Sequence, residues 1–411
     1  MHTRIATPNT RPDYSFGFYQ GDRMKTRVAT FTALAAIVAV ATLAVGCSSS
    51  SSSKSSNTIR IGLEAPISGS LSELGQGMLN GAKQAATQVN ANGGVGGKKI
   101  EIVAIDDKGD PDAGVGAANN AVKAGLDAVV GPYNSGVGLK TLPIYTAAGL
   151  VPLRLTSSDE TAGLGFTLQP MTSQIAPVAT DALVKELKAT SVALIVDSTT
   201  DYTKAAGQAM TASLGKAGIK ITTTESITPG AKSYTDTVTK VLATNPSAVY
   251  VITYYPEAGL IAQAMLAANT TSKCLADYGA YDNGYITAAG IPAAQKCPVV
   301  GVPAPSDFPD SAALVAAYTK QFNGAPGSWS PYTYDSVMVL ADAIGRAGGT
   351  SAGPLKAALI ATKGWKGWTG TVAFDPTTGN RIPAPVTVDT VDSSGAFHVD
   401  PAWISATGFT Y

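Results

Sequence analysis

The scarcity of histidine is the feature that most restricts the catalytic mechanisms open to this chain. The sequence contains two histidines, His2 and His398. His398 stands near the carboxyl end, far in sequence from the loops described below. A Ser-His-Asp or Cys-His mechanism needs a histidine beside its nucleophile. We therefore interpret His398 as a surface or hydrogen-bonded residue and expect no enzyme activity, although an exported enzyme with another base beside a nucleophile remains an alternative.

Sequence patterns for metals and nucleotides are weak. Cys-x-x-Cys and His-x-x-x-His pairs do not occur in the sequence, so we predict no metal. A glycine cluster at residues 75–81 resembles a dinucleotide-binding turn, with Asp106 where a ribose-binding acid would lie. Its last spacing is one residue too long, and the cluster does not directly follow a predicted strand. We interpret these glycines as close-packing positions of a helix and expect no cofactor.

Hydroxyl and aromatic side chains are what the loops after the predicted strands offer instead. These groups can hold a carboxylate or carbonyl and form the walls of a ligand site without transforming the ligand. The alternative is that they are turn-forming residues and surface aromatics. The residues are Tyr133, Asn134, Ser135, Thr156, Ser157, Ser158, Tyr202, Tyr254, Tyr255, Tyr278 and Tyr281.

Short β-branched runs alternate with longer alanine-rich amphipathic stretches, which predicts parallel sheets flanked by helices. The expected strands are 58–63, 100–105, 128–130, 151–155, 192–196, 219–224 and 249–253. Gly93-Gly94 predicts the end of the first helix, and Asp110-Pro111 the start of the second. The alternation of strands and helices begins again with the strand at Val192, so we expect a second α/β lobe from about residue 175. Ligands of such sheets bind beyond the carboxyl ends of the strands.

The amino-terminal segment has the layout of a signal peptide. A basic start at residues 24–27 precedes an uncharged, largely apolar run from Phe31 to Gly46, which is about 16 residues long, whereas a membrane span needs roughly 20. Leu43, Ala44 and Gly46 before Cys47 resemble a bacterial lipobox. We predict that Cys47 is lipidated and that Met24 is an alternative start. Residues 48–56, serine except for one lysine, form a flexible tether.

The remainder of the chain, roughly 350 residues, is long enough for two domains. The 29 basic and 29 acidic side chains cancel, so a nucleic-acid partner is not expected. If Cys47 is lipidated, Cys274 and Cys297 are the remaining cysteines. We predict a disulfide between them because disulfides persist in the oxidising environment of exported proteins. The alternative is two buried free thiols.

Ordered motifs along almost the whole mature chain resemble the branched-chain amino-acid-binding (leucine-isoleucine-valine-binding) family of ABC-transporter receptors. They are Ile61-Gly62, Pro66-Ile67-Ser68-Gly69, Asn90-Ala91-Asn92-Gly93-Gly94-Val95, Asp106-Asp107, Asp110-Pro111, Val129-Val130-Gly131-Pro132, Gly149-Leu150-Val151-Pro152, Tyr254-Tyr255-Pro256-Glu257 and Tyr334-Asp335.

This resemblance implies an α/β fold of two doubly wound parallel-sheet lobes joined by a three-strand hinge, the type I periplasmic-binding-protein fold. The organisation it implies is an upstream extension and signal peptide at 1–46, the lipidated cysteine and tether at 47–57, a first lobe at 58–174 plus 304–368, and a second lobe at 175–303 plus 369–411. The family's ligand-binding positions fall on Ser135, Thr156, Ser158, Tyr202, Tyr254 and Tyr278.

Two of these positions depart from the family pattern. Tyr278 stands where the family has the acid that accepts hydrogen bonds from the ligand ammonium, and Leu74 stands where an aromatic residue is usual. Losing a charge-assisted hydrogen bond costs roughly 1.5 to 3 kcal/mol. Asp277 or Asp282 could replace the acid from a neighbouring position. Otherwise the ligand is an amide, a urea-like compound or an aromatic acid instead of a branched-chain amino acid.

The function implied by the resemblance is capture of a small ligand on the outer face of the cell membrane. The protein would be a lipid-anchored monomer that closes its lobes over the ligand and docks on an ABC permease. A sensor of the same fold that reports to a signalling partner is the alternative.

Overall fold

The computed structural model describes residues 57–409. The predicted signal peptide, Cys47 and the tether up to residue 56 lie outside the described residues. All seven predicted strands are present and differ from the prediction mainly at their ends.

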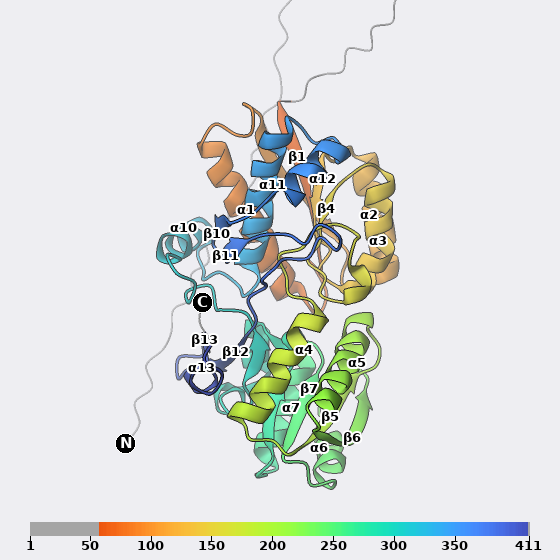
Figure 1. Cartoon of the computed structure of the whole chain (residues 1–411), viewed down its shortest axis with the longest axis vertical. Helices are drawn as coiled ribbons and strands as arrows, with labels where there is room; N and C mark the ends of the chain where they lie inside the picture. Colours follow the sequence, from red (N-terminus) through yellow and green to blue (C-terminus); the bar gives the residue numbers. More distant parts are fainter. Residues whose placement is uncertain (1–56, 410–411) are drawn as a thin grey trace, which may run out of the picture. The chain divides into compact units, whose positions relative to one another are not determined.

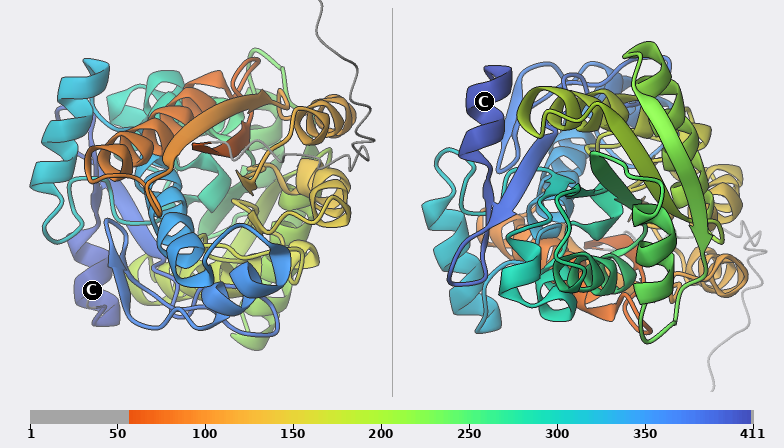
Figure 2. Two further views of the ribbon diagram at one scale, coloured as in Figure 1. Left: turned by 90° about the horizontal axis from the view of Figure 1, so that it is seen from above. Right: turned by 90° about the horizontal axis from the view of Figure 1, so that it is seen from below.

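The first sheet has four parallel strands in the order β2-β1-β3-β4. Helices cover both of its faces. Figures 1 and 2 show α1 on the opposite side of β1 from α2 and α3. The strands are β1 Thr58–Ala65, β2 Lys99–Asp106, β3 Ala128–Val130 and β4 Pro152–Leu153. The helices are α1 Ser72–Ala91, α2 Pro111–Lys123, α3 Ser135–Ala147, α10 Ala312–Phe322, α11 Ser330–Ala347 and α12 Ala352–Ile360.

The second sheet has seven strands in the order β13-β12-β9-β8-β7-β5-β6. Strands β5 to β9 are parallel, and β12 and β13 add antiparallel pairings at one edge that the sequence did not locate. The strands are β5 Ser191–Asp197, β6 Lys220–Ile227, β7 Ala248–Ile252, β8 Lys273–Ala276, β9 Val299–Gly301, β12 Thr387–Val391 and β13 Phe397–Val399.

Helices also flank the second sheet, with α4 against α5 and α7 against α6 and α8. Their bounds are α4 Thr172–Asp181, α5 Asp201–Lys216, α6 Thr235–Leu242, α7 Tyr255–Ala267, α8 Asn283–Ala289, α9 Ile291–Ala294 and α13 Pro401–Thr407. A π-helical turn at Ala182–Glu186 and two short 3₁₀ turns, η1 Asp159–Thr161 and η3 Tyr278–Ala280, complete the helical elements.

Local sequence accounts for the helix ends that position the loops. The Asp110 side chain accepts hydrogen bonds from the backbone N–H groups of Asp112 and Ala113, both at 2.8 Å, and Pro111 occupies the first helical position of α2. Helix α1 ends at Ala91, directly before the predicted glycine stop. Both helix limits are therefore confirmed.

The glycine cluster serves close packing, as the sequence indicated. A β-carbon on Gly81 would lie 2.2 Å from the Ser330 carbonyl oxygen on α11. One on Gly75 would lie 2.1 Å from the Pro66 carbonyl oxygen. Helix α1 therefore approaches α11 and the loop after β1 as closely as it does only because these positions carry no side chain.

The chain passes between the two sheets three times, after β4, after β9 and after β11. The first and third connections touch, because Thr167 forms a parallel bridge with Asn380 and the Gln174 amide donates to the Arg381 carbonyl at 3.2 Å. The ribbon of β10 Trp365–Gly367 and β11 Gly370–Val372 lies directly before the third connection. The exact lobe boundaries stay a prediction, and the one expected at 368/369 falls inside this ribbon.

Candidate functional site

The candidate site lies where strands of both sheets end. In the first lobe, Tyr133 to Ser135 follow β3 and Leu155 to Ser158 follow β4. In the second lobe, Tyr202 lies in the first turn of α5 after β5, Tyr254 precedes α7 after β7, and Tyr278 begins η3 after β8. Carboxyl ends of parallel strands share one edge of their sheet, which is why residues far apart in sequence meet here.

Side chains from these loops enclose a cavity between the two lobes. Its volume is about 10 Å³, close to the space that one water molecule occupies. None of the described residues that line it is charged. They are Tyr133, Ser135, Leu155, Ser157, Tyr202, Tyr254 and Tyr278.

Four of the six predicted ligand-binding residues thus share one cavity: Ser135, Tyr202, Tyr254 and Tyr278. The hydroxyls of the other two are engaged elsewhere. The Thr156 hydroxyl lies 2.7 Å from that of Thr161, and the Ser158 hydroxyl accepts the Glu160 backbone N–H at 3.3 Å, capping η1. The Ser158 backbone N–H donates to the Ser135 hydroxyl at 3.1 Å, so Ser158 supports the site through its backbone. Ligand binding by all six stays a prediction.

Leu155 and Ser157 are cavity residues that the predicted set did not include. The segment after β4 is extended, and alternate side chains of an extended chain point the same way. Leu155 and Ser157 line the cavity, whereas Thr156 between them does not. Ser157 is among the strand-end hydroxyls named from the sequence, and applying this period of two to residues 155–157 would have added it to the ligand-binding set.

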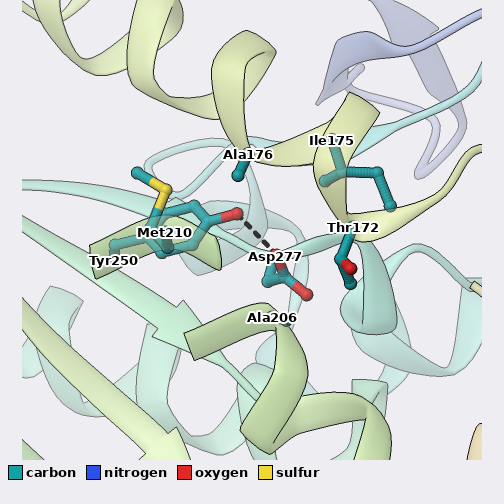
Figure 3. Close-up of a pocket in the computed structure, with 7 residues that line it drawn as sticks. All are labelled: Thr172, Ile175, Ala176, Ala206, Met210, Tyr250 and Asp277. Carbon is teal, nitrogen blue, oxygen red and sulfur yellow. Dashed lines mark hydrogen bonds between the residues drawn. The ribbon is translucent and has the colours of Figure 1, made fainter. Parts of the chain in front are cut away.

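Asp277 does not line the cavity, and its carboxylate is already engaged. It accepts hydrogen bonds from the Tyr250 hydroxyl at 2.6 Å and from the Tyr202 hydroxyl at 2.7 Å. Figure 3 shows the first of these in a separate small pocket whose lining also includes Thr172. Burial raises the pKa of Asp277, and the two tyrosine hydroxyls partly oppose that shift. Asp277 therefore orients Tyr202.

Asp282 is the second acid near the site. It is buried, and one of its oxygens accepts the Gly284 backbone N–H at 3.0 Å, capping α8. Burial raises its pKa to about 7. Like Asp277, it is not among the described residues that line the cavity.

Hydrogen bonds hold the two lobes together around the cavity. The Asn134 side-chain amide donates to the Tyr254 hydroxyl at 3.1 Å, and the Tyr255 hydroxyl donates to the Ser70 carbonyl at 2.9 Å. The Tyr278 hydroxyl donates to the side-chain carbonyl of Gln169, in the first connection between lobes. These contacts describe a closed arrangement of the lobes.

Trp329, which the sequence did not single out, sits among the aromatic rings behind the cavity. Its ring centroid is 4.9 Å from that of Tyr278, 5.9 Å from Tyr133 and 5.8 Å from Tyr281. Trp329 is only 1% exposed, and its indole N–H has no hydrogen-bond partner among the described residues. Buried indole N–H groups usually find a partner.

Two buried acids lie beneath the first-lobe part of the site. A β-carbon on Gly131, just before Tyr133, would lie 2.1 Å from the Glu64 carbonyl oxygen, so β1 and this loop are in contact. The Glu64 carboxylate accepts from the Thr141 hydroxyl at 3.2 Å, and Asp107 accepts the Gly109 backbone N–H at 2.8 Å. Burial, with Asp107 nearby, raises the pKa of Glu64, and burial raises that of Asp107 to about 7.

His398 lies on β13, away from the cavity lining. Its Nδ1 is 3.0 Å from Asp307 and its Nε2 is 3.5 Å from Asp392. Its interpretation as a hydrogen-bonded residue is confirmed. No group of three or more His, Cys, Asp or Glu side chains in the described part of the chain is arranged to hold a metal ion.

Cys274 and Cys297 form a disulfide, with sulfur atoms 2.05 Å apart and a sequence separation of 23. The bond links β8 near its amino end to the segment just before β9. It therefore closes the crossover that carries Tyr278 at the end opposite to the cavity.

Known proteins share this sequence pattern and arrangement of lobes. The family model described as "Periplasmic binding protein" matches residues 58–396. The chain belongs to the periplasmic binding protein family. Members of this family are extracytoplasmic substrate-binding proteins. No helix between residues 57 and 409 is long and apolar enough to cross a bilayer.

Individual relatives and structures agree with this assignment. An "Amino acid binding protein" of Pseudomonas aeruginosa is 32% identical, over 72% of this chain and 80% of that protein. A second match is the structure of LivJ, the branched-chain amino acid substrate-binding protein of Streptococcus pneumoniae, in complex with isoleucine. Its sequence is 26% identical, the match covers 84% of this chain and 99% of that chain, and the TM-score is 0.75. The leucine-binding protein LivK of Thermotoga maritima, 21% identical, covers 83% of this chain and 97% of its own, with a TM-score of 0.77. The type I periplasmic-binding-protein fold is thus confirmed.

Proposed function

We propose that this protein captures a small polar solute between its two lobes and delivers it to an ABC importer in the membrane. The observation that carries the proposal is the cavity at the carboxyl ends of both sheets, enclosed by hydroxyl and aromatic groups. Such a site orients a ligand without supplying a nucleophile and a base. Its location is the one at which open α/β sheets bind ligands.

The polar head of the ligand binds the first lobe in this proposal. The Ser135 hydroxyl lies at the start of α3, a helix of 13 residues, where backbone N–H groups favour a carboxylate. Ser157 adds a second hydroxyl to the same cavity. Thr156 and Ser158 complete this part of the site as the family resemblance implies.

The second lobe then closes tyrosine rings over the ligand. Tyr202, Tyr254 and Tyr278 supply walls with polar tips. A branched-chain amino acid is one candidate ligand, as in the relatives named above. Because no described cavity residue is charged, an amide, a urea-like compound or an aromatic acid, none of which carries an ammonium group, is the other.

The protein is proposed to act as a monomer on the outer face of the cell membrane. Export followed by lipidation of Cys47 would attach it there, and two or more acyl chains suffice for stable anchoring. The serine-rich tether would let the lobes reach the permease. Cys47→Ser should release the exported protein from the membrane fraction, which immunoblotting of fractionated cells measures; unchanged membrane association would contradict the anchor.

The test of the proposed function is a thermal-shift screen of the purified protein, followed by calorimetric titration of the hits. The compounds are branched-chain amino acids, their amides, urea-type compounds and small aromatic acids. A ligand at 100 times its dissociation constant should stabilise the protein by about 2.7 kcal/mol. Unchanged melting with every compound at millimolar concentration would contradict the proposal, and conversion of a bound compound into a product would show enzyme activity.

A further inference from the structure

The cavity between the lobes is too small for the solutes proposed above. Ligand sites usually enclose about 300 to 1,000 Å³, whereas this cavity has about 10 Å³. Side chains fill the remaining space. A ligand can therefore occupy this site only if the lobes open further or a surrounding side chain moves, and the structure indicates which side chain that is.

A second, larger pocket lies close to the cavity. We call it the side pocket; it has a volume of about 260 Å³ and lies between the second connection, helix α10 and the loop before α11 on one side and the second lobe on the other. Its lining includes Tyr281, Val315, Ala325, Ser328 and Phe397. None of the described residues that line it is charged, so it suits an apolar or aromatic group with few polar atoms.

Trp329 lines neither space, but its ring lies against residues of both linings. Its ring contacts Tyr133 and Tyr278, which line the cavity, and also Tyr281, which lines the side pocket. The residue before it, Ser328, belongs to the side-pocket lining. Turning this one ring away would therefore join the cavity to the side pocket.

Hydrogen bonds hold the residues just after Trp329, which favours a rotation of its side chain over a movement of its backbone. The Ser330 hydroxyl donates to the Gly77 carbonyl at 2.8 Å, and the Thr333 hydroxyl donates to the Met78 carbonyl at 2.8 Å. Both bonds attach the start of α11 to α1.

Unpaired polar atoms lie along the same route. The Trp329 indole N–H and the Tyr281 hydroxyl are buried and have no hydrogen-bond partner among the described residues. A buried donor without a partner costs about 1 to 3 kcal/mol. A carboxylate or amide oxygen of the ligand head placed between these rings would give both atoms a partner.

We propose that Trp329 is a gate and that the side pocket is the distal half of the ligand site. The ligand class this assigns is a small acid or amide with a bulky, uncharged distal group, such as an aromatic ring, which displaces Trp329 and occupies the side pocket. This inference rests on the proposed function and narrows it.

The test compares ligands that share a head and differ in the tail. The probes are L-valine with L-phenylalanine, and isobutyrate with 3-phenylpropionate, titrated calorimetrically into the wild-type protein. Val315→Trp fills the side pocket from α10. Ala316→Trp is the matched control, because Ala316 is the next residue of the same helix, is exposed and does not line the pocket.

Val315→Trp should weaken binding of the longer member of a pair about tenfold or more and change the shorter one less than twofold, a size discrimination typical of apolar pockets. Ala316→Trp should change neither. Ala396→Trp fills the same pocket from the second lobe and replaces Val315→Trp if thermal melting shows that the latter is unfolded. Binding of a long probe should also shift tryptophan fluorescence, and Trp329→Phe should abolish that shift.

Other results separate this inference from the function on which it rests. Three results would overturn the gate without contradicting solute capture. Val315→Trp could affect both members of a pair equally, it could affect neither, or only the short probes could bind. If none of the four probes and no compound in the wider screen binds, both the gate and the proposed solute capture are overturned.

Discussion

We propose that Tyr278 decides what kind of head group the site can hold. It stands where the family resemblance places an acid, and its hydroxyl is engaged by Gln169. The neighbouring Asp277 does not line the cavity, and its two oxygens accept hydrogen bonds from Tyr202 and Tyr250. In this proposal, the site has a neutral hydroxyl where the family resemblance places a charged acceptor.

Tyr278→Glu should restore binding of an amino-acid ammonium group. The added carboxylate contributes a charge-assisted hydrogen bond of roughly 1.5 to 3 kcal/mol, so the affinity for L-leucine should rise about tenfold or more. Calorimetric titration measures the change. Tyr278→Gln is the control, because it has a similar length and no charge, and equal leucine affinity in the two variants would contradict the assignment.

Asp107 should make the protein less stable as the pH rises. Its pKa is raised from about 3.8 to about 7 because it is buried. The folded state therefore holds a proton that the unfolded state has lost, and the resulting stabilisation, fully present below about pH 4, is lost as the pH rises to about 7. Asp107→Asn resembles the protonated acid and should raise the melting temperature above that of the wild type at pH 8, by about 2 °C or more.

Asp106, the residue adjacent to Asp107, should have the opposite effect on how stability changes with pH. Hydrogen bonds from the Ser68 hydroxyl and backbone lower its pKa against the effect of burial, so its stabilisation is present above its ordinary pKa and is lost as the pH falls. Asp106→Asn should lower the melting temperature at pH 7. Melts from pH 4 to pH 8 measure both variants, and the same sign for both at pH 8 would contradict the pKa assignments.

Elements differ in how far the sequence revealed them. Buried parallel strands such as β7 Ala248–Ile252 are continuous apolar runs between helices, so their positions could be predicted. The β10–β11 ribbon and the β12–β13 pair are short, half-polar and defined by distant partners, and the sequence did not locate them. Likewise, the loops of the site could be predicted from strand ends, whereas Trp329 directly precedes α11, where no strand end points to it.

The disulfide should stabilise the crossover between β8 and β9 without tuning the ligand site. In the chain-entropy model, closing a loop of this length contributes about 3 kcal/mol. The double substitution Cys274→Ser with Cys297→Ser should lower the free energy of unfolding by that amount in denaturant melts. Ligand affinity should change less than twofold, because Tyr278 lies at the other end of β8.

Dithiothreitol provides the control for this element. It should destabilise the wild-type protein and leave the double variant unchanged. A loss of ligand affinity of tenfold or more in the double variant, with an unchanged melting curve, would show that the disulfide shapes the site instead of the crossover.

At the scale of the whole molecule, one of the contacts that hold the lobes together does not involve a cavity residue. The Tyr255 hydroxyl of α7 donates to the Ser70 carbonyl just before α1, so this bond can exist only when the lobes are together. A ligand held by both lobes binds the closed form, and its apparent dissociation constant increases as the closed fraction decreases. Closure can therefore be weakened without altering a cavity residue.

Tyr255→Phe should weaken ligand binding about 2- to 10-fold, because the lost hydrogen bond contributes about 0.5 to 1.5 kcal/mol to the closed form. The unliganded variant should also have a larger radius of gyration in small-angle X-ray scattering than the unliganded wild type. Tyr334→Phe is the matched control: its hydroxyl donates to Gln88 within the first lobe, between α11 and α1, and it should change neither quantity. Equal effects of the two substitutions would mean that affinity follows general stability, whereas an effect of Tyr255→Phe alone would mean that the position of the closure equilibrium sets how tightly the solute is held.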